Sequence, residues 1–354
     1  MYAYTDYTSV EQLKMCAAFE RALHPWYATH RMTILVTGGL GFIGSEFVDF
    51  VLEETTDTVV NADVVGYASR LRNIEHERYR FLKMDINDME LEDLNGVDVV
   101  VNFAAETMVD QSIDNPAPFY RANVLGAAHL MRLAAKKSIR MVQISTDEVY
   151  GTLPPDVFAK EDAMYHPSNP YAASKACAEI FAKSYHNTYK LDIVITRSTN
   201  NYGPRQNREK FIPTIVNCIR EGKEIPLYGD GKHRRDWLYV RDNARAIYFV
   251  LKNGVAGEAY NIAGGNEREN RDMVELVVRA FNKATGKTHA HKTRSIPDEV
   301  IRPGHDRRYG VDASKLHTLG WKPEVTLEQG LEKTVHWYVE NPPDFAFARR
   351  NLRL

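Results

Sequence analysis

The sequence contains few cysteines, almost no net charge and no long apolar run. Its three cysteines, Cys16, Cys177 and Cys218, lack the spacing of a metal site and suit a reducing compartment. A formal net charge of −2 gives no reason to expect a nucleic acid or an anionic membrane as partner. We find neither a run of about 18 apolar residues that could span a bilayer nor a signal-peptide pattern. These absences predict a cytoplasmic protein without a metal, in which local basic clusters must bind any anionic ligand.

The chain is long enough for one large domain or two closely joined ones, since it has 354 residues, of which 44% are hydrophobic and 26% charged. Residues 1–31 precede the first predicted strand. Within them, Thr8–Glu11 has the pattern of a capping box, and a short helix is expected from there to Leu23, because Pro25 would end it. We expect this segment to be an appendage with no catalytic part.

A glycine-rich segment follows the first predicted strand, Thr33–Thr37, and precedes a predicted helix over 45–54. Its residues are Gly38-Gly-Leu-Gly41-Phe42-Ile43-Gly44. Glycines at this spacing allow a tight turn, let backbone N–H groups approach a pyrophosphate and bring the helix close to the sheet. A glycine triplet alone is a weak signal, but its place between a strand and a helix predicts a dinucleotide-binding loop.

The end of the second predicted strand, 58–62, indicates which dinucleotide binds. Asp63 follows that strand, and a carboxylate there accepts hydrogen bonds from the adenosine ribose and repels a 2′-phosphate. Val64 stands where a basic residue would favour a phosphate. The sequence therefore favours NAD over NADP.

Strand and helix patterns then alternate along the chain, which indicates a parallel, doubly wound α/β sheet of the Rossmann type. Further strands are predicted over 79–84, 97–103, 140–144 and 192–197, with a long helix over 116–136. Ligands of such sheets bind beyond the carboxyl ends of the strands. We therefore expect the cofactor to lie near the residues after the third and fourth strands, which are Asp85, Ile86, Ala104, Ala105 and Thr107.

The polar segment Ser145-Thr146-Asp147-Glu148-Val149-Tyr150 follows the fifth predicted strand. Adjacent residues of a regular strand point to opposite faces, so Asp147 and Glu148 reach one site only where the strand gives way to a loop. A predicted helix then carries Tyr171 and Lys175 at i and i+4, on one face, so that the ammonium can lower the pKa of the phenol. Thr146, Tyr171 and Lys175 are thus expected to remove a proton from a substrate alcohol.

Together these motifs resemble the extended short-chain dehydrogenase/reductase family and, within it, the dTDP-glucose 4,6-dehydratases. The resemblance covers roughly residues 32–340 and also includes Ala104–Thr107, Asn200–Pro204, Arg235–Val240, Tyr260–Ile262 and Arg302–Tyr309. The glycines and the Tyr-x-x-x-Lys motif occur throughout the superfamily. Thr146-Asp147-Glu148 is more specific, because epimerases of this fold usually have small residues at the last two positions, whereas related decarboxylases and GDP-mannose dehydratases have Ser-Glu.

The resemblance implies a reaction that yields a 4-keto-6-deoxy sugar. Tyr171, assisted by Thr146 and Lys175, would deprotonate the sugar 4-hydroxyl as a hydride leaves C4 for NAD; Tyr171 and Lys175 would also contact this cofactor. Glu148 would then remove the C5 proton while a protonated Asp147 donates to the departing 6-hydroxyl, before the hydride returns to C6. Two carboxyl groups packed in a closed site can differ in protonation in this way, because they resist ionising together.

The resemblance also implies a binding site for a nucleotide sugar. By position, its residues would be Thr107, Asn200, Lys210, Arg235, Asn270, Arg302 and His305. Arginine suits the diphosphate through bidentate contact. Thr107-Met108 and Gln111 replace residues that are often Ser-His and arginine in the family, and Val64 and Ser69 depart from its usual adenosine-binding loop. The nucleotide and the sugar therefore stay open, with thymidine as the default and uridine as the runner-up.

Three segments are expected on this basis: an appendage over 1–31, an NAD-binding Rossmann domain with the catalytic residues over 32–200, and a mainly nucleotide-sugar-binding region over 201–354, parts of which can return to the sheet. Paired long helices, typical of the family, imply a homodimer. Two other functions remain open: an epimerase or 5,6-dehydratase of the same fold, and a non-catalytic NAD-binding protein. The complete set of reacting groups argues against the last, since a sensor needs no acid–base pair.

Overall fold

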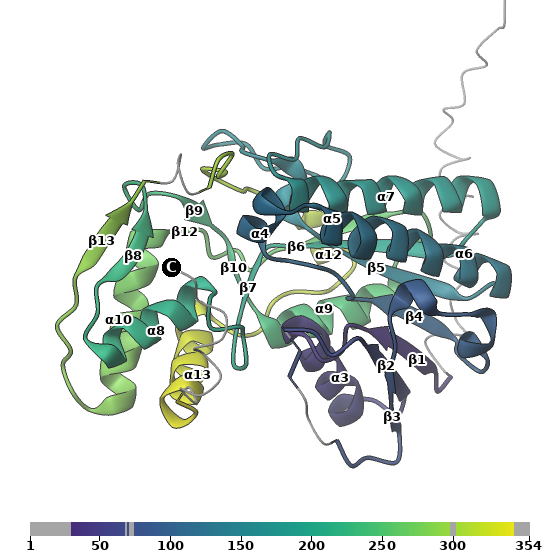
Figure 1. Cartoon of the computed structure of the whole chain (residues 1–354), viewed down its shortest axis with the longest axis horizontal. Helices are drawn as coiled ribbons and strands as arrows, with labels where there is room; N and C mark the ends of the chain where they lie inside the picture. The colour runs from purple at the N-terminus through teal and green to yellow at the C-terminus, as the bar shows by residue number, and fades with distance from the viewer. Residues whose placement is uncertain (1–29, 68, 71–73, 298–301, 343–354) are drawn as a thin grey trace, which may run out of the picture.

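A computed structural model of the chain describes residues 30–67, 69–70, 74–297 and 302–342 (Figure 1). The helix expected between Thr8 and Leu23 lies outside these residues. Among the helices that are described, none is long and apolar enough to cross a membrane.

The centre of the fold is a seven-stranded parallel sheet in the order β11-β6-β5-β4-β1-β2-β3, which confirms the predicted fold class (Figure 1). The strands are β1 (Thr33–Thr37), β2 (Thr58–Asp63), β3 (Tyr79–Lys83), β4 (Val99–Asn102), β5 (Arg140–Thr146), β6 (Ile193–Ser198) and β11 (Ala259–Ile262). The predicted strands are present with shifted ends. In particular, β5 continues to Thr146, two residues beyond its predicted end at 144.

Helices cover both faces of this sheet, which is why its strands, apart from the edge strand β3, are largely buried on both sides. On one face, α3 (Phe42–Glu54) and α9 (Val240–Asn253) pack on a core that contains Ile34 and Val36. On the other, α6 (Ala127–Lys137) and α7 (Pro170–Tyr189) pack on a core that contains Leu35. Alternate residues of β1 therefore enter opposite cores, as the strand period requires.

The single helix predicted over 116–136 is wrong in detail. The segment consists of α5 (Ala117–Phe119), a π-helical stretch η3 (Tyr120–Gly126) and α6. Within η3, the Asn123 amide donates to the Glu106 carbonyl at 2.9 Å and to the Ser174 hydroxyl at 2.8 Å. This buried amide joins the loop after β4 to α7, and π-helical stretches are frequent at such functional positions.

A second, smaller region lies beyond the carboxyl end of β6, where the chain passes directly into β7 (Asn200–Tyr202) (Figure 1). Its helices are α8 (Phe211–Glu221), α10 (Asn270–Thr285) and α13 (Leu327–Glu340), which share a third apolar core. Its strand pairs are β7 with β10 (Trp237–Tyr239), β8 (Ile225–Tyr228) with β13 (Thr293–Ile296), and β9 (Arg234–Arg235) with β12 (Arg268–Glu269). Although they follow residue 201, α9 and β11 belong to the central sheet layer.

Shorter elements complete the described chain. They are η1 (Ile86–Asp88), η2 (Leu91–Leu94), α4 (Val109–Asp114), η4 (Asp147–Tyr150) and α12 (Ser314–Thr318). Of these, η4 and α4 bear on the site, because η4 continues directly from β5 and α4 follows the loop after β4.

Candidate active site

The glycine segment forms a close turn between β1 and α3. Gly38 has φ +72°, and its amide donates to the Ala62 carbonyl at 2.8 Å. A Cβ atom on Gly38 would lie 2.7 Å from the Ala104 amide nitrogen, and one on Gly44 would lie 2.4 Å from the Gly38 carbonyl oxygen. Side chains are therefore excluded at both positions, which lets the turn pack closely against the loop after β4 and against α3.

The helix α3 begins at Phe42, three residues before the predicted start at Ser45, so Phe42 and Ile43 belong to its first turn. Gly41 is its N-cap and makes no side-chain capping bond. The N–H groups and the positive end of the dipole at a helix N-terminus favour an anionic group. The residues of this turn thus fit the pyrophosphate of a dinucleotide.

Asp63, at the end of β2, braces the glycine segment. Its carboxylate accepts hydrogen bonds from the Leu40 amide at 3.0 Å, the Val65 amide at 2.8 Å and the Ser69 hydroxyl at 2.7 Å. Ser69, noted as a departure from the family pattern, therefore holds the residue predicted to contact the ribose. The ribose contact itself stays a prediction.

The other predicted cofactor residues also lie at carboxyl ends of strands. Asp85 follows β3, caps η1 by accepting from the Asn87 amide at 2.9 Å, and lies 3.8 Å from the Arg121 guanidinium. Ile86 is buried, and Ala104 contacts the Gly38 turn. The structure thus brings the ends of β1, β2, β3 and β4 to one edge of the sheet, where the sequence placed the cofactor.

Asp147 and Glu148 lie in the 3₁₀ turn η4, where β5 ends. The Thr146 hydroxyl caps this turn by accepting from the Glu148 amide at 3.3 Å, and it donates to Asp147 Oδ1 at 3.2 Å. Because the turn replaces the alternation of a strand, the two carboxyl groups are close enough for the charge of Glu148 to raise the pKa of Asp147.

Asp147 is the better proton donor of the two carboxyl groups. Burial, followed by the charge of Glu148, raises its pKa to about 8, against the opposing effects of Arg235 and the Thr146 hydrogen bond. The Asp147 side chain is buried, and its Oδ2 atom has no hydrogen-bond partner among the described residues. A protonated carboxyl group with a free oxygen can donate to a substrate at neutral pH.

Glu148 has more polar surroundings. Burial raises the pKa of Glu148, whereas the guanidinium groups of Arg302 and Arg235 act to lower it. Its Oε2 atom accepts from the Asn169 amide and from the Tyr309 hydroxyl, each at 3.4 Å. Different environments for two neighbouring carboxyl groups are the arrangement that divides acid from base.

Sequence reasoning missed Asn169 and Tyr309 as partners of Glu148. Asn169 caps α7 by accepting from the Ala172 amide at 2.9 Å, and the Asn-Pro pair before this helix was an available N-cap signal. Tyr309 ends the arginine-rich stretch that the resemblance included, but nothing local indicated that its hydroxyl reaches a residue 161 positions away.

Tyr171 and Lys175 lie on the first turns of α7, as predicted, but the expected lowering of the phenol pKa by the ammonium is not found. Burial raises the pKa of Tyr171, helped by the charges of Glu148 and Asp147, and only the Thr146 hydrogen bond opposes this. The Lys175 amine instead donates to the Ile144 carbonyl at 2.6 Å, and burial lowers its pKa to about 8. Desolvation thus dominates both groups.

Lys210 and Thr107 come together at the edge of this site. The Lys210 amine, at the N-cap of α8, donates to the Thr107 carbonyl at 3.4 Å. Burial lowers the pKa of Lys210, while the charges of Glu209 and Glu148 act to raise it. A residue of the second region thus adjoins both the loop after β4 and the carboxyl pair.

Arg302 and His305 reach the site from the stretch that follows β13. Arg302 Nε donates to Asp110 Oδ1 at 2.6 Å, and its guanidinium lies 5.3 Å from the centre of the Tyr228 ring. The His305 ring stacks on that of His233 with centroids 4.2 Å apart. Burial and neighbouring arginines lower the pKa of His305 far below its usual range, so this ring is neutral.

Arg235 is placed differently from a simple diphosphate ligand. Its guanidinium donates to the carbonyls of Arg234 at 2.8 Å, Asp306 at 2.7 Å and Arg307 at 3.3 Å, and it covers the Tyr309 ring at 4.3 Å. It is buried and acts on the pKa values of both Asp147 and Glu148. Its position therefore bears on the carboxyl pair as well as on an anionic ligand.

Two asparagines predicted for the substrate have unused acceptors. Asn200 starts β7 and Asn270 starts α10, and the buried Oδ1 atom of each has no hydrogen-bond partner among the described residues. Buried polar atoms normally find a partner. These two acceptors therefore fit a ligand that donates hydrogen bonds.

The fold and the site define an extended short-chain dehydrogenase/reductase, with a glycine-rich dinucleotide turn, an acidic pair at the end of β5 and a Tyr-x-x-x-Lys motif on α7. The family described as GDP-mannose 4,6-dehydratase matches residues 35–334. The chain belongs to this family.

Known proteins agree with this assignment. The chain is 42% identical over 338 residues to dTDP-glucose 4,6-dehydratase of Escherichia coli, a match that covers 88% of the chain and 93% of that protein. A dTDP-glucose 4,6-dehydratase of Streptomyces venezuelae, solved with NAD and dTDP bound, has 40% identity and a TM-score of 0.81, and the match covers 88% of this chain and 98% of that one. UDP-glucose 4-epimerase of Thermus thermophilus, solved with NAD, has 30% identity and a TM-score of 0.78, with 86% and 99% covered. Since both activities occur on this fold, the site must distinguish them.

Proposed function

We propose that this protein is an NAD-dependent nucleotide-sugar 4,6-dehydratase that converts dTDP-glucose, or a related NDP-hexose, to its 4-keto-6-deoxy form with loss of water. The observation that carries this proposal is the Asp147–Glu148 pair. Burial raises the pKa of Asp147 to about 8, so that it is protonated at neutral pH, while arginines and hydrogen-bond donors surround Glu148. An enzyme that only inverts C4 needs no acid for a 6-hydroxyl and no base for C5.

The cofactor turn suits NAD. The residues that would hold its pyrophosphate are Gly38, Gly41, Phe42, Ile43 and Gly44, and Asp63 would contact the ribose. Asp85 and Ile86 would lie at the adenine. Ala104, Ala105, Thr107, Tyr171 and Lys175 would contact the part of the cofactor nearest the substrate sugar. When bound, NAD supplies a temporary acceptor for a hydride from the sugar. The Asp63 carboxylate and the uncharged Val64 beside it support NAD over NADP.

The proton transfers divide among the protein's own residues. Tyr171 is the proposed acceptor of the 4-hydroxyl proton. Burial raises the pKa of its phenol, so this role requires the positive charge that bound NAD would bring to favour the ionised phenol. Glu148 is the proposed base at C5, since Arg302 and Arg235 favour its ionised form. Asp147 is the proposed acid that protonates the departing 6-hydroxyl. Each such transfer contributes roughly 10²–10⁴ in rate.

The nucleotide and its diphosphate are proposed to lie between the sheet and the second region. The proposed contacts are Thr107, Asn200, Lys210, Arg235, Asn270, Arg302 and His305. Of these, Lys210 and Arg302 are close enough to Glu148 for their charges to interact with it. The names of the relatives support thymidine. The family description names a guanosine sugar instead. However, the sequence resemblance gives GDP-mannose dehydratases Ser-Glu at the positions of Asp147 and Glu148, so the aspartate argues against that sugar.

The test is to incubate the purified protein with dTDP-, UDP-, GDP- and CDP-glucose and to weigh the products. Loss of one water from dTDP-glucose, with a ketone at C4, is expected. A C4 epimer of unchanged mass would identify an epimerase. Bound NAD without conversion of any of these sugars would identify a binding protein.

We also propose a homodimer that forms through α7 and η3. These adjoining elements expose large apolar side chains: Tyr120 at 48%, Leu125 at 63%, Ile180 at 54% and Phe181 at 41%. Glutamate at Leu125 and Phe181 should convert the dimer to a monomer in sedimentation experiments. Glutamate at the similarly exposed Phe158 (53%), which lies outside these elements, is the matched control.

We further propose a reducing, cytoplasmic location, which the free thiols of Cys177 and Cys218 support.

A further inference from the structure

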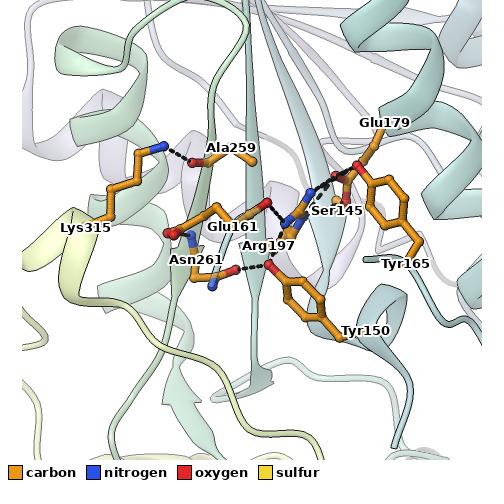
Figure 2. A network of polar contacts seen from close by, with 9 residues as sticks. All are labelled: Ser145, Tyr150, Glu161, Tyr165, Glu179, Arg197, Ala259, Asn261 and Lys315. Carbon is orange, nitrogen blue, oxygen red and sulfur yellow. Dashed lines mark hydrogen bonds and ion pairs between the residues drawn. The ribbon is translucent and has the colours of Figure 1, made fainter. Parts of the chain in front are cut away.

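A fully buried ion pair lies beside residues 145–151, here called the catalytic turn, and has no part in the proposed proton transfers. Arg197 of β6 and Glu179 of α7 both have 0% exposed side chains, and their closest atoms are 2.6 Å apart (Figure 2). Arg197 Nε also lies 3.1 and 2.9 Å from the two carboxylate oxygens. Removing two such charges from water costs several kcal/mol per ion. A pair of this kind therefore calls for a functional account.

Glu179 holds the start of the catalytic turn. The Ser145 hydroxyl donates to Glu179 Oε1 at 2.5 Å, and Ser145 immediately precedes Thr146, the cap of η4. Glu179 itself follows Lys175 by one helical turn and Tyr171 by two, on the same side of α7. One carboxylate thus connects the strand that carries the acidic pair with the helix that carries the phenol.

Arg197 holds the other end of the turn. Its Nη1 atom donates to the Tyr150 hydroxyl at 2.5 Å, and this hydroxyl donates to Asn261 Oδ1 of β11 at 2.8 Å (Figure 2). Tyr150 is the last residue of η4, and its ring lies 5.0 Å from the guanidinium carbon. Asp147 and Glu148 therefore lie between two anchors that both end on the same ion pair.

We propose that the Arg197–Glu179 pair positions the catalytic turn, residues 145–151, relative to α7, so that Asp147 and Glu148 keep their register with Tyr171. Tyr150 and Ser145 transmit this constraint and are positioning residues. The catalytic consequence rests on the proposed dehydratase function, whereas the structural constraint does not. Misplacing reacting groups by about 1 Å costs on the order of 100-fold in rate.

Two phenols on this ion pair offer a matched comparison. Tyr150 contacts it from the catalytic turn, whereas Tyr165 contacts it from outside this turn. The Tyr165 hydroxyl donates to Glu179 Oε2 at 3.0 Å and accepts from Arg197 Nη2 at 3.1 Å (Figure 2). Tyr150→Phe and Tyr165→Phe each remove one hydroxyl from the same pair. A purely stabilising pair would respond alike to both changes.

The first measurement is amide hydrogen exchange of residues 146–151 in the full-length protein. We expect exchange there to be at least tenfold faster in Tyr150→Phe and close to the wild-type rate in Tyr165→Phe. Unchanged exchange in Tyr150→Phe, or equal acceleration in both variants, overturns the proposal. This result does not depend on any enzymatic activity, so the proposal is decided even if the wild type converts no nucleotide sugar, an outcome that would refute the proposed function alone.

The second measurement is steady-state kinetics with the sugar that the wild type dehydrates. Tyr150→Phe should lower kcat by about 10- to 100-fold with KM changed less than threefold, while Tyr165→Phe keeps kcat within about threefold. The double variant Glu179→Leu with Arg197→Met replaces the pair by apolar side chains, which often preserves or raises stability. The variant should stay folded, as checked by its Tm, but its kcat should fall. A double variant with wild-type kcat would show that the pair is dispensable for positioning.

Discussion

The hydroxyl of Tyr309 lies 2.9 Å from Asp306 Oδ2 and 3.4 Å from Glu148 Oε2, so that one phenolic proton faces two carboxylates. Burial, followed by the charge of Glu148, raises the pKa of Tyr309 well above its usual value, so the phenol is neutral and can donate to only one of them at a time. Donation to Glu148 stabilises its ionised form, which is the form required of a base.

Tyr309→Phe should therefore weaken Glu148 as a base. We expect kcat to fall by roughly tenfold with little change in KM, since a hydrogen bond to a charged group contributes about 1.5–3 kcal/mol. Incorporation of solvent deuterium at C5 should slow in parallel. The control is Tyr260→Phe, which removes a buried hydroxyl that accepts a hydrogen bond from the Val255 amide, away from the site. A normal rate of C5 exchange in Tyr309→Phe would remove Tyr309 from the mechanism.

Asp147 should make the activity fall as the pH rises. Its acid form is the active one, so kcat should be lost as the pH passes its pKa of about 8. Asp147→Asn should oxidise C4 yet stall before water is lost, because an amide cannot protonate the 6-hydroxyl, and absorbance of the reduced cofactor should persist. Normal turnover by Asp147→Asn would contradict the assignment.

The same residue should make the folded state less stable at high pH. The pKa of Asp147 is raised from 3.8 to about 8 on folding, so the folded protein binds the extra proton between these values, and its free energy of unfolding falls as the pH rises through them. In Asp147→Asn this fall in the free energy of unfolding is absent, because the amide does not ionise. Its Tm relative to the wild type should therefore increase between pH 5 and pH 9, and a constant difference would show that the carboxyl group is not buried as described.

Glu148→Gln should abolish exchange at C5 while C4 oxidation continues. Product made by the wild type in deuterated water should carry deuterium at C5, because Glu148 removes the C5 proton. Deuterium placed at C4 of the sugar should reappear at C6, because bound NAD would only hold the hydride temporarily. Tyr171→Phe is the comparison, as it should fail before any oxidation. Retention of the label at C4 in the wild type would exclude a 4,6-dehydratase.

Arg302→Ala should act mainly on binding. We expect KM to rise by at least tenfold, because a phosphate contact is made equally in the ground and transition states. We expect kcat to fall by a smaller factor, because Arg302 also favours the ionised form of Glu148. Asp110→Asn, which removes the carboxylate bonded to Arg302 Nε, should alter KM far less. A collapse of kcat at normal KM would place Arg302 with the reacting groups.

The sequence by itself determined the features that depend on neighbours along the chain. The turn at Gly38–Gly44, the strands on either side of it, the Thr146–Glu148 motif and the helical pairing of Tyr171 with Lys175 all follow from local conformation or from the period of a strand or helix. The same local rules placed Asp63 and Asp85 at strand ends. The sheet and its ligand-binding edge could therefore be predicted.

Only the tertiary structure decided the features that join distant residues. Tyr309 meets Glu148 across 161 positions, Asn261 meets Tyr150 across 111, and Arg197 meets Glu179 inside a core that no local pattern describes. The reversed expectation for Tyr171 has the same origin, since the helical spacing indicated an ammonium nearby but not that burial would raise the pKa of the phenol. Spacing decides which residues can meet, whereas packing decides which charges lose their water, and the pKa values of this site depend mainly on that loss.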